Sequence, residues 1–465
     1  MKQVEEKRGT SDPGGFGDRV ALATIVVLGL VLTVVQIVIG PGLVLDDWYA
    51  LRNAELDGTF HAADSGLRAA RPGAAFTFGL AFGVVGDDRI GLVLFRMAVV
   101  VAVAVLCFLI LRRFLPVGPS ATVALVWLVL PNHMSLEFWP SALVSSVSLM
   151  AVLLGWLLMC RTPSSVWSLA TACVLFAFAV LTYESNALPV AVAGLALPWL
   201  ATGRPQWVQT AAVWGTLALT TLWSLTHWHS VKSARNSLSA YPDVVQAHFG
   251  WGVFPDDVAP IGVVLFSGAA VWALLRLAMP SFRGSAGAPE RLVLAGLVVM
   301  VVGSVTFVLY FYAPLGAGDR VSYMSSLGGA MVMVGLLWTL WRRRQPVAAL
   351  ALIVVVGTTL VVRADRSRTW VTAGADADRI IEAIKGTDPS CTAIYLGPMP
   401  IQRQNVAAFL DASNVDGAVQ LALGRRDVKG FMTFDEETFS QIPEGCRVDI
   451  RPLSDLEADV VVGPT

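Results

Sequence analysis

Charged residues are scarce in this chain: Asp, Glu, Lys and Arg make up 14% of its 465 residues, whereas 55% are hydrophobic. A soluble domain of this size needs a more polar surface, so the composition predicts an integral membrane protein with the lipid bilayer as a partner. The formal net charge of −1 gives no bulk electrostatic attraction for nucleic acid. We therefore expect no nucleic-acid partner.

Cysteine is also scarce, with five residues, too few for a disulfide scaffold. Cys107, Cys160 and Cys173 fall within apolar runs, where buried free thiols are expected. Cys391 and Cys446 lie in the polar C-terminal tail. They could form a disulfide if that tail lies outside the cell, but their separation in sequence does not decide it.

Motifs for nucleotide chemistry are missing too. The chain has no Gly-rich NTPase loop, no Rossmann fingerprint and no Cys-x-x-Cys metal motif. Nucleotide-driven chemistry inside the cell is therefore not expected, and the sequence predicts no cofactor.

Long apolar runs are what the sequence has in abundance. A helix needs roughly 17–25 apolar residues to cross the hydrocarbon core. Runs of this kind lie near residues 20–40, 90–111, 117–131, 140–160, 164–182, 187–202, 207–227, 259–279, 291–311, 324–341 and 346–363. The first is too long for the core of a signal peptide and predicts a retained anchor. The expected fold class is a polytopic α-helical membrane protein with about eleven transmembrane helices.

The distribution of Lys and Arg predicts how the chain crosses the membrane. Basic residues gather in the N-terminal tail, residues 1–19, and in alternate short loops such as those that hold Arg112, Arg113 and Arg342–Arg344. By the positive-inside rule the N terminus is cytoplasmic and the C-terminal tail extracytoplasmic. We expect a multi-pass protein of the plasma membrane.

The expected transmembrane domain, residues 20–363, contains a polar first loop, residues 41–89, on the outer side of the membrane. The apolar stretch 73–86 within this loop predicts a helix lying in the membrane surface, or else a re-entrant segment. Beyond the last apolar run the composition becomes that of a soluble protein. Residues 364–465 predict a small extracytoplasmic α/β domain, with helices at 369–385 and 405–423 and strands at 392–396 and 447–450.

Two adjacent carboxylates, Asp46 and Asp47, follow the first apolar run. Their mutual repulsion raises at least one proton affinity unless a cation or water compensates, which makes a carboxylate a usable base near neutral pH. We therefore predict that they are catalytic. Trp48 and Tyr49 beside them fit a site, although a helix cap, a solvated loop and interfacial anchors explain the same residues.

Other loops on the same predicted side carry candidate substrate-binding groups. Arg320, which follows Asp319 after a Gly-rich turn, is suited to bind a phosphate oxygen; a snorkelling Arg or an internal Asp–Arg pair is the alternative. His133 and Glu137 are four residues apart and would share a face of a helical turn. They could hold a hydroxyl or a metal, but no third ligand has a recognisable spacing, so a divalent metal is possible and not favoured.

Glu184, beside Tyr183 at the end of an apolar run, is costly to bury and is therefore a further candidate, with loop solvation as the alternative. Together these loops predict one pocket on the outer face. We expect it to open sideways to lipid and to be covered by the C-terminal domain.

Three short motifs follow one another along the chain: Asp46-Asp47-x-x-Ala50-x-x-Asn53, Arg71-Pro72 ahead of Gly86, and Arg320-x-x-Tyr323-x-x-Ser326-x-Gly328. Up to about residue 340 the chain resembles the membrane half of the tetratricopeptide-bearing O-mannosyltransferases and their bacterial relatives, which are multi-span type-C glycosyltransferases. The resemblance implies a polyprenyl-phosphate-linked sugar as donor and no metal. It also implies Asp46 or Asp47 as general base and Arg320 at the leaving phosphate, with Arg71 and Tyr323 in the substrate site.

The chain departs from that pattern in four places. Pro131-x-His133 and Glu137 resemble a Pro-x-His-x-Glu loop with a longer spacing, and Tyr183-Glu184 stands where relatives tend to have Lys-Glu. Ser325 replaces a Pro, and the small C-terminal domain replaces the tetratricopeptide tail. Because of these departures the resemblance does not identify the acceptor. A non-catalytic member of the same group is the alternative.

The expected function is therefore inverting transfer of a sugar to a hydroxyl of a glycan, lipid or protein acceptor in the cell envelope. A transporter or lipid-binding protein that does not transform its polyprenyl-phosphate ligand is the alternative. Transporters place ionisable groups near the membrane midplane, and here Arg96 is the main charge inside an apolar run. A third reading, a sensor with its spans as an anchor, needs far fewer spans.

Overall fold

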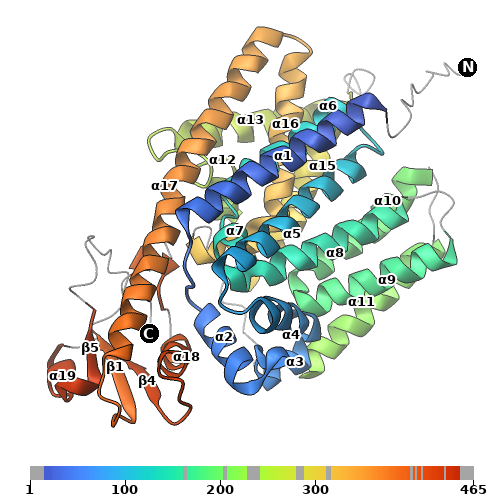
Figure 1. The fold of residues 1–465 in the computed structure, drawn as a ribbon. Helices are drawn as coiled ribbons and strands as arrows, with labels where there is room; N and C mark the ends of the chain where they lie inside the picture. The colour runs from blue at the N-terminus through green and yellow to red at the C-terminus, as the bar shows by residue number, and fades with distance from the viewer. Residues whose placement is uncertain are drawn as a thin grey trace, which may run out of the picture.

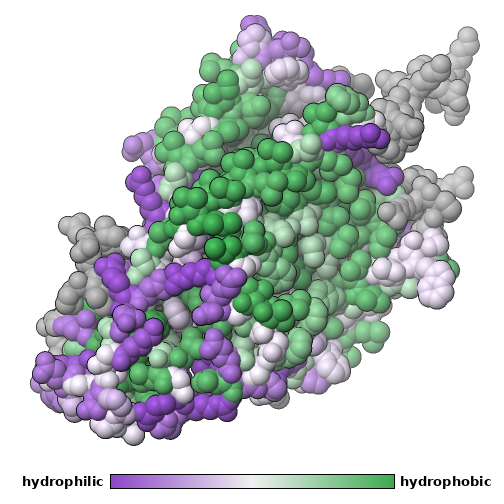
Figure 2. All heavy atoms as spheres, viewed as in Figure 1, coloured by the Kyte–Doolittle hydropathy of each residue, from purple (hydrophilic) through white to green (hydrophobic). Residues whose placement is uncertain are grey.

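Long helices fill the apolar ranges and lead into a small α/β domain at one end of the bundle (Figure 1). The computed structural model describes residues 15–160, 165–202, 207–227, 241–278, 287–310, 316–397, 402–403, 406–409, 412–433 and 436–450. Figure 2 shows apolar side chains over the flank of the bundle and polar ones over the α/β domain and the opposite end. This distribution is the one that a bilayer imposes on a spanning bundle.

Each of the predicted apolar runs is helical in the structure. The helices are α1 (Phe16–Ile39), α5 (Arg89–Leu111), α6 (Val117–Val129), α8 (Leu143–Met159), α9 (Val166–Thr182), α10 (Ala187–Thr202), α11 (Trp207–His227), α13 (Ala259–Ala278), α15 (Ala288–Tyr310), α16 (Tyr323–Trp341) and α17 (Gln345–Lys385). Within the described ranges, seven helices are long and apolar enough to cross a membrane. The polytopic helical fold is confirmed, and the full set of about eleven spans stays a prediction.

Small residues let neighbouring helices approach closely, as is common in membrane bundles. A Cβ at Gly328 of α16 would lie 2.5 Å from the carbonyl oxygen of Gly296 on α15, so only glycine fits this crossing. At the end of the bundle away from the first loop, Arg112 after α5 pairs with Asp18 near the start of α1, with 2.6 Å between Nε and Oδ1.

The last apolar run was expected to end near residue 363, but α17 continues without a break to Lys385. No proline follows Pro346 within this helix, so one helix carries the chain out of the bundle. Where α17 passes the start of the first loop, a Cβ on Gly42 would lie 2.6 Å from the Cα of Gly374. The boundary at residues 363 and 364 is therefore a change of composition within one continuous helix.

The first loop is mostly helical. It forms α2 (Asp47–Asp57), a short η1 (Thr59–His61), α3 (Ser65–Ala70), α4 (Pro72–Phe78) and a π-helical turn η2 (Gly79–Val85). The predicted surface helix at 73–86 corresponds to α4 and η2, and α4 packs against α8 and α9. Its place in the membrane surface, or as a re-entrant segment, stays a prediction.

The C-terminal domain contains a parallel three-stranded sheet in the order β4 (Lys429–Met432), β1 (Ala393–Gly397), β5 (Arg447–Asp449). The two predicted strands are confirmed, whereas β4 was not foreseen. The helix expected from residue 405 begins only at Ala412, as α18 (Ala412–Leu423), because β3 (Val406–Ala407) pairs with β2 (Gln402–Arg403) instead. Cys391 and Cys446 form a disulfide with their Cα atoms 5.8 Å apart, which settles the open question of their pairing.

Seven short elements complete the described chain. They are α7 (Ser135–Phe138), η3 (Pro140–Ala142), η4 (Glu184–Asn186), α12 (Tyr241–Phe249) and η6 (Gly316–Ser322), with α19 (Glu436–Ser440) and η7 (Glu444–Cys446) in the C-terminal domain. Several of them connect long helices at the end of the bundle that carries the first loop. The candidate site is built mainly from these connections.

Candidate functional site

Asp47 is the first residue of α2 and is completely buried. One carboxylate oxygen accepts a hydrogen bond from the Val44 amide (3.0 Å), and the other accepts from the amide (2.8 Å) and hydroxyl (2.6 Å) of Ser141. These bonds join the first loop to η3. Burial raises the pKa of Asp47 to about 7, and the hydrogen bonds from Ser141 and Val44 oppose that rise. The raised pKa was foreseen, but its main cause is burial rather than repulsion by Asp46.

Asp46 has the opposite environment, although it is the adjacent residue. Its side chain is exposed and makes no capping hydrogen bond to α2, which removes the helix-cap reading. The carboxylate accepts a hydrogen bond from Nδ2 of Asn414 on α18 (3.1 Å). Asp46 is therefore the member of the pair that a substrate can reach.

Arg320 lies in η6 with its guanidinium over the ring of Trp139, 4.6 Å from the ring centroid. The side chain is half-buried, and none of the residues that the structure describes forms a hydrogen bond or ion pair with it. Its N–H donors are therefore available to an anion. This arrangement favours neither of the two alternatives, a snorkelling arginine or an internal pair with Asp319. Trp139 is two residues before Ser141, so Arg320 and Asp47 lie at the two ends of one short segment. Neither aspartate touches Arg320 directly.

Asp319 points the other way from its neighbour. Its buried carboxylate accepts hydrogen bonds from the amides of Met134 (3.0 Å) and Ser135 (2.9 Å) at the start of α7. Arg366 of α17 reaches the same region and donates to the carbonyls of Pro131 (3.2 Å) and Gly252 (3.1 Å). Asp319 thus fixes the loop before α7 in place, and it forms no internal pair with Arg320.

His133 and Glu137 are both completely buried, yet they have separate partners. His133 stacks on Trp127 with centroids 4.7 Å apart, and its Nδ1 lies 3.0 Å from the hydroxyl of Ser326. Burial lowers the pKa of His133 to about 3, with help from the charge of Arg363, so the imidazole is neutral.

Glu137 forms an ion pair with Arg363 of α17 and accepts a hydrogen bond from Gln36 of α1 (3.3 Å). The expectation that His133 and Glu137 share one face and act together is therefore not met, since each has its own buried partners. Within the described part of the chain, no three His, Cys, Asp or Glu side chains gather where they could hold one metal ion.

A second cluster gathers Arg71, Tyr183, Glu184 and Tyr323, all predicted from the sequence. Arg71 pairs with Glu184 and also lies 5.5 Å from the ring centroid of Tyr183. The rings of Tyr183 and Tyr323 are 6.1 Å apart, and the Tyr323 hydroxyl lies 2.9 Å from the Ser185 hydroxyl. In the Lys-Glu pattern the Lys supplies a cation next to the Glu. In this chain Arg71 supplies a cation beside Glu184 instead.

Sequence reasoning missed several residues of the site. Arg363, Arg366 and Trp370 reach it from α17, and Trp370 packs against Trp139 with centroids 6.4 Å apart. The sequence does contain a pattern that could have indicated them: three large polar or aromatic residues at helical spacing, at the end of the last apolar run. Arg96, the main charge inside an apolar run, is buried, donates to the Phe138 carbonyl (3.3 Å) and interacts electrostatically with Asp47 and Glu137.

Solved structures offer one point of comparison. The chain is similar to an archaeal oligosaccharyltransferase. The Archaeoglobus fulgidus enzyme in its apo form aligns with a TM-score of 0.45 at 10% identity, over 79% of this chain and 58% of that one. Its complex with Zn and sulfate aligns at 0.44, with 9% identity, over 89% and 62%. The same organism's AglB with an inhibitory peptide and a dolichol-phosphate aligns at 0.46, with 10% identity, over 89% and 64%.

Scores this low do not establish a common fold. This chain also spans only about three fifths of the length of those enzymes. No protein-family model matches the chain, and no curated protein sequence does.

Proposed function

We propose that this protein is a membrane glycosyltransferase that moves a sugar from a polyprenyl-phosphate donor to an acceptor hydroxyl on the outer face of the plasma membrane. The observation that carries the proposal is the half-buried guanidinium of Arg320, which rests on Trp139 without an anionic partner among the described residues. A cation held in this way beside apolar helices suits the phosphate of a lipid-linked sugar. The short motifs shared with the type-C glycosyltransferases support the same function.

In the proposed reaction, an acceptor hydroxyl attacks the anomeric carbon of the donor from the side opposite the phosphate. A bond forms between the acceptor oxygen and that carbon, the bond from the carbon to the phosphate oxygen breaks, and the configuration inverts. Asp46 accepts the hydroxyl proton, since its carboxylate is exposed and is held only at one oxygen, by Asn414, among the described residues. Arg320 donates hydrogen bonds to the departing polyprenyl phosphate.

The other candidates take supporting roles in this proposal. Asp47 holds the start of α2 against η3 and so positions Asp46. Arg71, Tyr183, Glu184 and Tyr323 form a further subsite for the donor, with a cation and two aromatic rings. Asp319, His133 and Glu137 shape the loop that carries Trp139. A divalent ion is not required by these roles, and activity with and without a chelator tests that point.

The test replaces Asp46 and Asp47 separately by Asn and measures transfer from a polyprenyl-phosphate sugar to envelope acceptors. Loss of a general base costs about a hundredfold or more, so Asp46→Asn should lose at least that factor while its melting temperature stays unchanged. Glu55→Gln, at an exposed carboxylate of the same helix, is the matched control. Full activity in Asp46→Asn would remove Asp46 as the base, and full activity in both Asp variants would remove the mechanism.

A lipid-binding protein without catalysis is the second candidate. The observation that favours it is the burial of Asp47, whose two oxygens are both occupied by hydrogen bonds. Binding of the donor with no transfer to any acceptor, in the wild-type protein, would select this alternative.

A further inference from the structure

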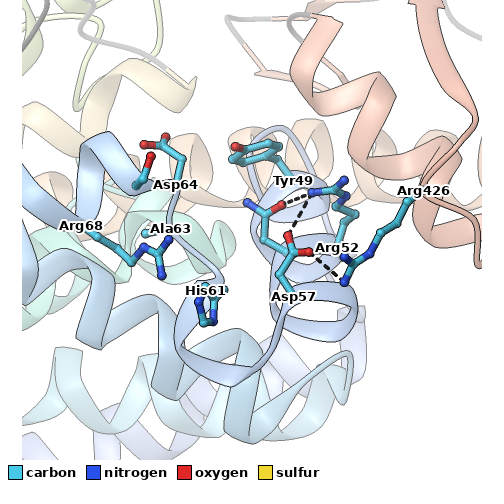
Figure 3. A pocket seen from close by; sticks show the side chains of 10 residues that line it. Tyr49, Arg52, Asp57, His61, Ala63, Asp64, Arg68 and Arg426 are labelled. Atoms are coloured by element: carbon cyan, nitrogen blue, oxygen red, sulfur yellow. Dashed lines mark hydrogen bonds and ion pairs between the residues drawn. The ribbon is translucent and has the colours of Figure 1, made fainter.

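A hollow of about 470 Å³ lies between the first loop and the C-terminal domain, and the proposed reaction does not use it. Its lining comes from α2, the η1–α3 turn and the loop after α18: Tyr49, Arg52, Asn53, Asp57, His61, Ala63, Asp64, Ser65, Arg68 and Arg426. Figure 3 shows Arg68 and Arg52 entering this space from opposite sides. A cavity with a few convergent polar groups is the usual form of a ligand site.

Positive charge exceeds negative charge in the hollow. Asp57 is shared by two arginines, Arg52 at 3.2 Å and Arg426 at 2.8 Å. Asp64 is occupied as the cap of α3, where it accepts from the Leu67 amide (2.7 Å). Arg68 is half-buried, and no side chain in the described ranges forms a hydrogen bond or ion pair with it. The hollow therefore contains a guanidinium that lacks an anion.

The walls of the hollow are also held rigidly. Arg52 donates from Nε to Gln420 of α18 (2.6 Å) and from Nη1 to the Asn53 side chain (2.6 Å). The ion pair between Asp57 and Arg426 joins the first loop to the C-terminal domain at a second place. The hollow is thus formed in advance of any ligand, which lowers the entropy that binding must overcome.

The hollow shares a face of α2 with the proposed base. Asp46, Tyr49 and Asn53 are spaced by three and four residues, so their side chains lie along one side of the helix. From Asp46 to Asn53 the helix advances about 10 Å, at a rise of about 1.5 Å per residue. The hollow therefore lies about 10 Å along α2 from Asp46, and α18 packs on α2 between them, with Asn414 at Asp46 and Gly417 against Tyr49.

We propose that the hollow binds an acidic sugar of the acceptor, a saccharide that carries a carboxylate or a phosphate. Arg68 pairs with the acidic group, for which a guanidinium offers two parallel hydrogen bonds. Tyr49, Asn53 and Ser65 contact the sugar hydroxyls and ring. The inference deepens the proposed function and rests on it, since it gives the acceptor a chemical class.

The experiment measures binding to the purified full-length protein by calorimetry, with no donor present. The probes are a galacturonic acid hexasaccharide, a singly phosphorylated maltohexaose and neutral maltohexaose. At least one acidic probe should bind ten or more times more tightly than the neutral one, and the arm that does so identifies the acidic group as carboxylate or phosphate. Arg68→Gln should abolish that preference, and Arg68→Lys should keep part of it.

Arg425→Gln is the matched control, because Arg425 neighbours Arg426 but pairs with Asp427 and does not line the hollow. It should leave the preference for the acidic probe unchanged. Equal binding of all three probes, binding of none, or a preference that survives Arg68→Gln would overturn the proposal. Asp46→Asn should still bind the acidic probe, so a failure of the proposed catalysis can be told from a failure of this site.

Discussion

Asp46 and Asp47 show how far two adjacent carboxylates can differ. The chain turns sharply just before them, where Leu45 adopts a φ of 55°, and this sends Asp47 inward to Ser141 and Asp46 outward to Asn414. The sequence identified the pair from its place after an apolar run. It could not assign the two roles, because the partners that separate them come from residues far along the chain.

Asp47 should make the stability of the protein depend on pH. Its pKa is raised in the folded state to about 7 from 3.8, so folding favours the protonated form. The stabilisation is therefore complete below about pH 4 and is lost as the pH rises through about 7. The melting-temperature advantage of wild type over Asp47→Asn should be largest at about pH 4 and below, and smallest above about pH 7.

The comparison with the variant at each pH is necessary because buried histidines act in the opposite direction. Burial lowers the pKa of His133 to about 3 and of His248 to about 4, so both contributions are present above their ordinary value of 6.5 and are lost as the pH falls. These contributions cancel when variant and wild type are compared at the same pH. A difference that stays constant from about pH 4 to about pH 8 would contradict the role given to Asp47.

Arg320 should govern the use of the lipid-linked donor. Removing a hydrogen bond to a charged group costs about 1.5–3 kcal/mol, so Arg320→Gln should lower kcat/KM for the donor by roughly tenfold to a hundredfold. Arg320→Lys keeps the charge but lacks the planar guanidinium. Its kcat/KM for the donor should lie between those of the wild type and Arg320→Gln. Arg343→Gln is the control, since Arg343 also lies over a tryptophan, Trp272, at 5.4 Å. An unchanged donor kcat/KM in Arg320→Gln would exclude Arg320 from the phosphate site.

At the scale of elements, apolar periodicity was sufficient to place the long helices. It was not sufficient at their ends: α17 continues past residue 363, because the residues that follow still suit a helix and pack against α18 and the start of the first loop. In the C-terminal domain, the residues around Val406 carry a helical pattern but pair as strands, since tertiary contacts override weak local preference there.

The packing of α18 on α2 depends on one glycine. A Cβ at Gly417 would lie 2.8 Å from the Cα of Tyr49, closer than packed atoms approach. Gly417→Val should therefore push α18 away and destabilise the protein by about 1–3 kcal/mol. Thermal unfolding measures the effect, and Gly357→Val, where a Cβ meets nothing within 4 Å, is the control. Equal melting temperatures in the two variants would show that α18 does not dock closely on α2.

At the scale of the whole molecule, the predicted gathering of distant loops is realised in part. Arg71, Tyr183, Glu184 and Tyr323 come together, and Arg320 is joined to Asp47 through the segment from Trp139 to Ser141. The order of motifs along the chain could indicate this much. It could not indicate that Glu137 turns inward to Arg363, because such a buried pair depends on how α17 crosses the bundle.

The passage of α17 through the site leads to a prediction about truncation. A chain that ends at residue 363 loses Arg366, which holds the Pro131 carbonyl, and Trp370, which packs on Trp139 beneath Arg320. It should lose donor binding. A chain that ends at residue 385 keeps α17 but lacks α18 and the Arg426 wall of the hollow.

The longer truncated chain should therefore still bind the donor and release its sugar slowly to water, while transfer to envelope acceptors falls by at least about a hundredfold. A labelled donor separates the two outcomes, since free sugar and glycosylated acceptor are counted in the same assay. Size-exclusion chromatography checks that both chains remain monodisperse in detergent. Full transfer by the chain that ends at residue 363 would show that the bundle alone holds the site, because neither α17 beyond residue 363 nor α18 would then be needed to position Asp46 and Arg320.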